Sequence, residues 1–127
     1  MNLKRKGTNA ERELVHLFWK VGWAAIRVAG SGSIKYPAPD LIAGNGIRRV
    51  VVECKSPGGD SVYLTTKEVL ELKQFGDKIG AECWIGVRFN AKWVFLGMEE
   101  LEPTPTAYVV SVKKAQLRGV SFEELTT

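Results

Sequence analysis

The chain has 127 residues, 45% hydrophobic and 25% charged, which is an ordinary globular composition and excludes a disordered or fibrous protein. Its apolar runs fall far short of the roughly 20 residues of a membrane span, and residues 1–13 lack the apolar core of a secretion signal. The formal net charge is +4, and residues 1–60 hold ten Lys and Arg against five Asp and Glu, so this half is either a solvated basic surface or a nucleic-acid contact.

We therefore expect one intracellular domain, residues 1–127, that does not contact a membrane. Cys54 and Cys83 are its only cysteines and show no metal-site spacing. Two reduced thiols are the simpler interpretation, with a disulfide as the alternative.

The first predicted element is a helix over residues 8–22, in which apolar side chains recur at helical spacing until a glycine ends it. Thr8 and Glu11 match a capping box, which would give Glu11 a local structural role. At about 100° per residue, Glu11 also projects at the border of the apolar stripe, so a second role stays open. A short strand over 23–29 and a loop rich in Gly, Ser and Pro over 30–40 follow.

A hairpin is predicted over residues 40–55, because two β-rich segments flank Asn45-Gly46, a strong signal for a two-residue turn. Alternation along the second strand places Glu53 and Lys55 on one face, at the end of an apolar run. An unpaired buried carboxylate is costly. Either Glu53 and Lys55 neutralise each other, or Glu53 holds a cation while Lys55 holds an anion beside it.

A second carboxylate, Asp40, begins the first strand of this hairpin. Counting outward from the turn pairs Asp40 with about residue 51, which leaves Glu53 within a diagonal step. Two converging carboxylates repel unless a cation lies between them, and their oxygens suit Mg²⁺ or Mn²⁺ better than Zn²⁺. Together with Glu11, they predict metal-assisted phosphodiester hydrolysis, in which Lys55 orients a water or offsets charge.

The rest of the chain completes an α/β pattern. Residues 56–64 are predicted to be irregular or a short edge strand, and Thr65 with Glu68 forms a capping box for a helix that ends at Gly80. Strands are expected at 81–89, 92–96 and 107–112, a linker at 103–106 and a short helix at 121–125. This order predicts a mixed central sheet flanked by helices.

Several stretches are similar to one nuclease family. Pro39-Asp40 followed by Glu53-Cys54-Lys55 resembles the PD-(D/E)xK signature, and KRKGTNAERELVHLF, RVAGSGSIKYPAPDLIAGNG and VVECKS together resemble the archaeal Holliday junction resolvases. The resemblance covers residues 4 to about 56 well, is looser through the next helix and two strands, and fades past Pro103. It implies a restriction-endonuclease-like core, with a mixed sheet flanked by helices, in a compact homodimer.

The resemblance also implies a Mg²⁺-dependent crossover junction endonuclease, for which Mn²⁺ can substitute and which needs no organic cofactor. Such an enzyme resolves four-way DNA junctions by paired cuts during recombination and repair, in the cytoplasm beside the nucleoid. A related nuclease for other branched or duplex DNA, and an architectural protein that binds junctions without cutting, remain as alternatives.

For the site, the resemblance implies that Asp40 and Glu53 bind the metal together with the main-chain carbonyl of Cys54. Lys55 is implied as the catalytic lysine, and Glu11 as a further metal ligand that acts through a water.

Either Ser31 or Ser33 matches a serine that matters in related enzymes, and the resemblance leaves both open. We assign Ser31 to catalysis and Ser33 to DNA. The expected DNA-binding residues are Lys4, Arg5, Lys6, Arg12, Arg27, Ser33 and Lys35.

The second helix is the expected dimer interface, through Leu72, Phe75 and Ile79, with Gly76 permitting close approach. The alternative is that this helix packs only onto its own sheet. A two-fold dimer with two sites would match the symmetry of a four-way junction.

Overall fold

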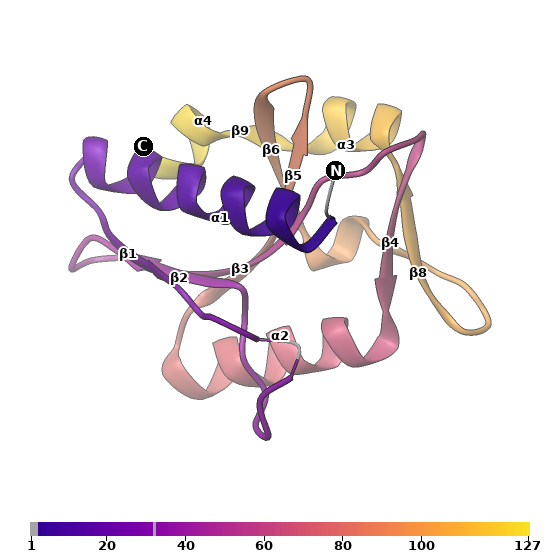
Figure 1. Cartoon of the computed structure of the whole chain (residues 1–127), viewed down its shortest axis with the longest axis horizontal. Coiled ribbons are helices and arrows are strands. Elements are labelled where there is room, and N and C mark those ends of the chain that lie inside the picture. Colours follow the sequence, from indigo (N-terminus) through magenta and orange to yellow (C-terminus); the bar gives the residue numbers. More distant parts are fainter. Residues whose placement is uncertain (1–2, 32) are drawn as a thin grey trace.

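The computed structural model describes the backbone of residues 3–31 and 33–127, and the side chains from residue 7 onward except residue 32. Its central feature is a six-stranded sheet in the order β1-β2-β3-β5-β6-β9 (Figure 1). β3 and β5 run parallel, and the other neighbours are antiparallel, which confirms the predicted mixed sheet. The strands are β1 Ala24–Arg27, β2 Leu41–Gly44, β3 Arg49–Lys55, β5 Glu82–Phe89, β6 Lys92–Gly97 and β9 Val120–Ser121.

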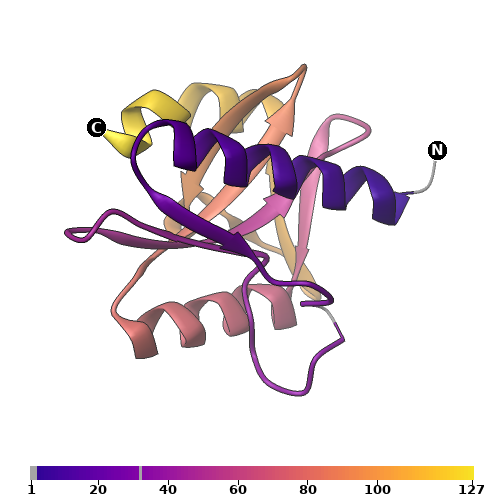
Figure 2. The ribbon, with the colours of Figure 1, turned by 60° about the vertical axis from the view of Figure 1, so that its left-hand side comes forward.

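Two long helices, α1 (Leu3–Lys20) and α2 (Thr66–Ile79), cover opposite faces of this sheet (Figure 2). Alternation along β3 explains this arrangement, since Val50 and Val52 pack with α1 side chains while Val51 packs with those of α2. The smaller helical elements are η1 Met98–Glu100, α3 Val112–Arg118 and α4 Phe122–Thr126. None of the helices within residues 3–31 and 33–127 is long and apolar enough to cross a membrane.

A second, three-stranded sheet in the order β4-β8-β7 was not predicted. It combines β4 (Ser61–Thr65), β8 (Ala107–Ser111) and β7 (Glu102–Pro103). The expected strand at 107–112 is therefore confirmed, but it pairs outside the central sheet. The expected linker is only the turn between β7 and β8, in which Thr104 N donates to Ala107 O at 2.8 Å.

The β2–β3 hairpin has a longer turn than predicted. Gly44 pairs with Arg49, and Asn45 Oδ1 accepts bonds from the amides of Ile47 and Arg48 at 2.9 and 2.7 Å, which closes a four-residue loop. The expected two-residue turn, and the pairing of Asp40 with residue 51, are wrong.

The longer loop shifts the register of the hairpin. Leu41 pairs with Val52, and the amide of Asp40 also donates to Val52 O at 3.1 Å, so Asp40 lies beside Val52 and not beside residue 51. The charge of Asp40 contributes to raising the pKa of Glu53, so the two carboxylates lie close together, as predicted.

The first helix starts at Leu3, five residues before the predicted start. Thr8 and Glu11 consequently lie inside α1, where the backbone amides are bonded within the helix, and the expected capping box is wrong. The Thr65–Glu68 capping box of α2 is confirmed, and Gly80 ends that helix in the left-handed conformation with φ of 70°.

The predicted dimer face of α2 is partly wrong. Leu72 is only 1% exposed and packs in the core of its own chain, so it cannot contact a partner. A side chain at Gly76 would collide with Cys83, so this glycine brings α2 close to β5 of the same chain. Phe75 is half-buried, while Ile79 remains 41% exposed.

Candidate active site

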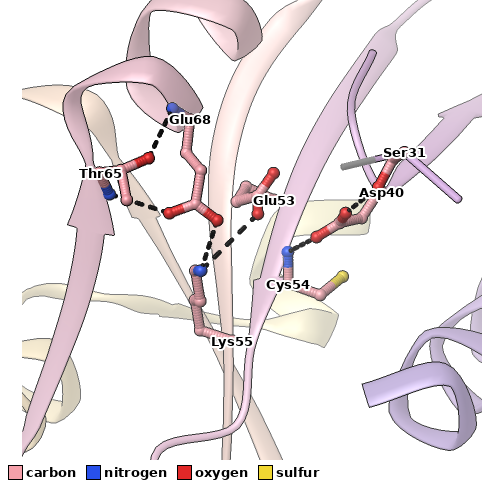
Figure 3. A network of polar contacts seen from close by, with 7 residues as sticks. All are labelled: Ser31, Asp40, Glu53, Cys54, Lys55, Thr65 and Glu68. Carbon is pink, nitrogen blue, oxygen red and sulfur yellow. Dashed lines mark hydrogen bonds and ion pairs between the residues drawn. The ribbon is translucent and has the colours of Figure 1, made fainter. Parts of the chain in front are cut away.

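Asp40 is fixed at the end of the 30–40 loop, between β1 and β3. Its amide donates to Val52 O at 3.1 Å, and its carbonyl accepts a bond from the Val28 amide at 2.8 Å. The side chain, 9% exposed, accepts hydrogen bonds from Ser31 Oγ at 2.6 Å and from the Cys54 amide at 2.8 Å (Figure 3). The carboxylate is thus held by donors that belong to the fold.

Glu53, which is on β3, lies next to Asp40 and is 8% exposed. Figure 3 shows the Glu53 carboxylate between the Asp40 carboxylate and the Lys55 ammonium. Lys55 Nζ is 3.9 Å from Glu53 Oε2. Burial, then the charges of Asp40 and Glu68, raise the pKa of Glu53 to about 10, although Lys55 opposes the shift. A second positive charge is needed for Glu53 to ionise at neutral pH.

Lys55 bonds mainly to a residue that the sequence analysis did not assign to the site. Its Nζ donates to Glu68 Oε2 at 2.7 Å, while Glu68 Oε1 accepts the Thr65 amide at 2.8 Å. Burial alone would raise the pKa of Glu68, but the hydrogen bonds from Lys55 and Thr65 outweigh it and lower that pKa. Neutralisation of Glu53 by Lys55 alone, one of the two interpretations above, therefore does not describe this pair.

Glu11 approaches from α1, on the other side of the sheet. Its Oε1 is 3.4 Å from Arg27 Nε, and burial followed by the charge of Asp40 raises the Glu11 pKa, which Arg27 partly offsets. Among the described residues, no three side chains of His, Cys, Asp or Glu form a metal-binding group. Glu11 therefore stands near the Asp40–Glu53 pair without joining it directly, and its role through a water stays a prediction.

The expected role of Cys54 in the site concerns its main-chain carbonyl, which stays a prediction, and the structure argues against its thiol. Burial, and then the charges of Asp40, Glu11 and Glu53, raise the pKa of the thiol well above its usual value. A thiol that keeps its proton is a poor metal ligand. Both cysteines are free, as expected for reduced thiols.

The donors in the site fit a hard divalent cation. Asp40 and Glu53 present two buried carboxylates side by side, and oxygen ligands of this kind suit Mg²⁺ or Mn²⁺. An open groove of about 730 Å³, lined by residues 55–63, adjoins Lys55. Lys55 is therefore shared by this groove and by the site, where its Nζ lies 3.9 Å from Glu53 Oε2.

The expected DNA-binding residues are spread over α1, the end of β1 and the loop that follows it. Arg12 is exposed, Arg27 contacts Glu11, and the Lys35 ammonium lies 5.6 Å from the Tyr36 ring centre. Ser33 Oγ donates to Gly30 O at 3.0 Å. The side chains of Lys4, Arg5 and Lys6 lie outside the described residues, and DNA contact by this set stays a prediction.

Comparisons with known proteins identify the family of this chain. The family model for archaeal Holliday junction resolvase (Hjc) matches residues 2–127. The crossover junction endodeoxyribonuclease Hjc of Archaeoglobus fulgidus is 37% identical over 96% of each chain. The protein of the same name from Methanocaldococcus jannaschii is 32% identical, over 95% of this chain and 86% of its own.

The similarity extends to solved structures. The structure of Archaeoglobus fulgidus Hjc, a Holliday junction resolvase from an archaeal hyperthermophile, matches with a TM-score of 0.87 and 35% identity, over 95% of this chain and 100% of that one. Both the family model and this structure extend beyond Pro103, so the expectation that the resemblance fades there is wrong.

Proposed function

This chain belongs to the family of archaeal Holliday junction resolvases, and we propose that Asp40, Glu53 and Lys55 form its hydrolytic centre. Its fold is the mixed, restriction-endonuclease-like α/β core, and its activity is that of a crossover junction endonuclease. The observation that carries the proposed centre is the placement of two buried carboxylates near each other, with an ammonium group 3.9 Å from one of them (Figure 3).

We propose that the cofactor is Mg²⁺, held by Asp40, Glu53 and the main-chain carbonyl of Cys54. The raised pKa of Glu53 supports this, because a nearby cation would allow both carboxylates to ionise together. When bound, such an ion supplies positive charge that stabilises the anionic phosphate and makes water a stronger nucleophile.

Two side chains beside the carboxylate pair, Ser31 and Lys55, have further roles in the proposed centre. Ser31 donates to Asp40 and fixes the orientation of its carboxylate. Lys55 keeps a positive charge beside Glu53, where it would offset the charge that develops on the phosphate. The groove along residues 55–63 starts at Lys55 and would receive the DNA strand on one side of the cut.

A homodimer is proposed because an apolar face beside α2 is left uncovered. Ile26 and Ile42 are cross-strand partners on the same side of the sheet as Val51, which α2 covers, and Ile26 is 61% exposed. Phe75 and Ile79 flank the buried stripe of α2. Pairing these faces about a two-fold axis would give two sites for the two cuts in one junction.

The dimer proposal is tested by the association state in sedimentation experiments. Ile79→Lys should weaken the dimer, while Leu70→Lys, on the other side of α2 and 58% exposed in the chain, should leave it intact. Equal association of both variants would contradict this interface.

Binding to junction DNA should depend strongly on salt. If the basic residues of the loop and α1 neutralise about six phosphates, affinity should fall roughly a thousandfold between about 50 and 200 mM salt. Contacts of this kind read the shape of the junction more than its sequence. Because the substrate is chromosomal DNA, we propose that the enzyme works in the cytoplasm beside the nucleoid.

The direct test of the proposed centre is incubation of a synthetic four-way junction with Mg²⁺, and then with a chelator, followed by mapping of the nicks. We expect paired cuts with Mg²⁺ and none with chelator, and Lys55→Ala should bind the junction without cutting it. Equal cutting of duplex DNA of the same sequence would favour the related-nuclease alternative, and binding without cuts by the unaltered chain would favour an architectural role.

A further inference from the structure

The chain contains two capping boxes with nearly identical geometry. In one, Thr65 N donates to Glu68 Oε1 at 2.8 Å and Glu68 N donates to Thr65 Oγ1 at 3.0 Å. In the other, at α4, the corresponding distances between Ser121 and Glu124 are 2.9 and 3.0 Å. Both glutamates therefore stabilise the start of a helix in the same way.

The two boxes differ in what the second carboxylate oxygen does. Glu68 Oε2 accepts a hydrogen bond from Lys55 Nζ at 2.7 Å, whereas Glu124 is in no ion pair within the described part of the chain. The lysine that Glu68 holds is the one proposed above to act on the phosphate. The capping box of α2 is thus joined to the hydrolytic centre, and that of α4 is not.

We propose that Glu68 is a positioning residue, which holds the Lys55 ammonium in place for the cleavage step. This inference rests on the proposed role of Lys55. A lysine stem is long and flexible, and without a partner its ammonium would be free to move onto the carboxylates of the site. Glu68 holds it 2.7 Å away on one side, which leaves it 3.9 Å from Glu53 on the other.

This spacing leaves the carboxylate oxygens of Glu53 free of the Lys55 ammonium. At 3.9 Å, Lys55 Nζ is beyond ordinary hydrogen-bond distance from Glu53, so the Glu53 oxygens are not taken up by the ammonium. The carboxylate of Glu68 is itself rigid, since its other oxygen bonds to the cap backbone. The buried side chains of Val69 and Leu72 fix that first turn of α2 against the sheet.

The test compares Glu68→Gln with Glu124→Gln. Glutamine still accepts the bond from the cap amide, so both variants keep their capping boxes, but Glu68→Gln loses the charge that holds Lys55. We expect the single-turnover cleavage rate of Glu68→Gln to fall by about tenfold to a hundredfold, as for a misplaced catalytic group. Junction affinity measured with chelator, and the melting temperature, should match those of Glu124→Gln.

A third variant, Thr65→Ala, separates capping from positioning. It removes the oxygen that accepts the Glu68 amide but leaves the Glu68 carboxylate bonded to Lys55 and to the backbone of residue 65. Thr65→Ala should melt at a lower temperature and still cleave near the wild-type rate. Equal loss of cleavage in Thr65→Ala and Glu68→Gln would overturn the inference, because helix stability would then explain both.

Lys55→Ala distinguishes failure of this inference from failure of the proposed centre. If Lys55→Ala cleaves at the wild-type rate, the proposed role of Lys55 is wrong, and the inference falls with it. If Lys55→Ala is inactive while Glu68→Gln cleaves normally, the centre stands and only the positioning role is overturned. Loss in both variants, with normal junction affinity, supports it.

Discussion

Asp40 and Glu53 lie near each other at neighbouring strand ends, but their carboxylates have different hydrogen-bond partners. Asp40 accepts two short hydrogen bonds, from Ser31 Oγ and from the Cys54 amide. Glu53 is equally buried, but its ionic partner is Lys55 at 3.9 Å, and its pKa is raised to about 10. The comparison teaches that donors within the protein already stabilise the Asp40 carboxylate, whereas ionisation of Glu53 would be favoured by the cation proposed above.

The largest expected effect is loss of cleavage in Glu53→Gln or Asp40→Asn. Each amide keeps the size of the side chain but removes one of the two charges, so cleavage should fall by at least about a thousandfold. Junction affinity, measured by gel shift with chelator, should stay close to wild type. Glu123→Gln, at an exposed position of α4 outside the proposed site, is the control. Normal cutting by either site variant would remove the proposed centre.

The raised pKa of Glu53 makes a prediction about stability that does not involve DNA. In the metal-free protein, the folded state keeps the Glu53 proton up to a pKa of about 10, whereas the unfolded chain releases it near the ordinary glutamate pKa of 4.5. Stability is therefore lost as the pH rises through this window.

Glu53→Gln removes this loss, because glutamine does not titrate. Its free energy of unfolding in denaturant titrations should exceed that of wild type by at least about 2 kcal/mol at about pH 8, and equal it below about pH 4.5. The exposed Glu123→Gln serves as control. If the free energies of unfolding of wild type and Glu53→Gln change with pH in parallel, Glu53 is ionised without a cation. The proposed difference between Glu53 and Asp40 would then be wrong.

Added Mg²⁺ should stabilise the wild-type chain through the same residue. At about tenfold excess over the dissociation constant, the gain is about 1.4 kcal/mol, or about 5 °C in melting temperature. The gain should increase with pH, since binding requires Glu53 to release its proton. Glu53→Gln should show no shift in thermal melts, and an equal shift in that variant would place the ion elsewhere.

The smallest expected effect concerns Ser31, the serine that donates a hydrogen bond to Asp40. Ser31→Ala removes one donor from Asp40, which corresponds to about 1 kcal/mol and about a fivefold slower single-turnover cleavage. Ser33→Ala breaks only a bond to the carbonyl of Gly30, so its rate should stay near wild type. If Ser33→Ala is the slower variant, the assignment of the two serines is reversed.

Local patterns predicted most of the central sheet and both long helices. Alternation along residues 50–55 predicted two opposite faces of the strand, and this is confirmed, with α1 packing on one face and α2 on the other. The register was wrong because Asn45 uses its side chain to close a four-residue loop, a choice that the dipeptide Asn45-Gly46 does not reveal. The resemblance of residues 39–55 to a nuclease signature did not depend on that register.

Long-range pairing explains what the sequence did not reveal. β4 and β8 are separated by more than forty residues, and no local pattern indicates that they form a separate sheet. Glu68 was recognised as part of a capping box, and that role accounts for its presence without any contact to Lys55. Only the packing of α2 against β3 brings the two side chains together.

The four-residue loop at 45–48 lies at the far end of β2 and β3, about 13 Å from Asp40 at roughly 3.3 Å per residue. Surface loops usually accept insertions and deletions, because little depends on their length. The length of this loop sets the register of the hairpin. Adding or removing a single residue would slide one strand past the other. A neighbour of Glu53, whose side chain points to the opposite side of the sheet, would then take its place beside Asp40. The length of the loop should therefore be under selection although the loop touches neither substrate nor ion.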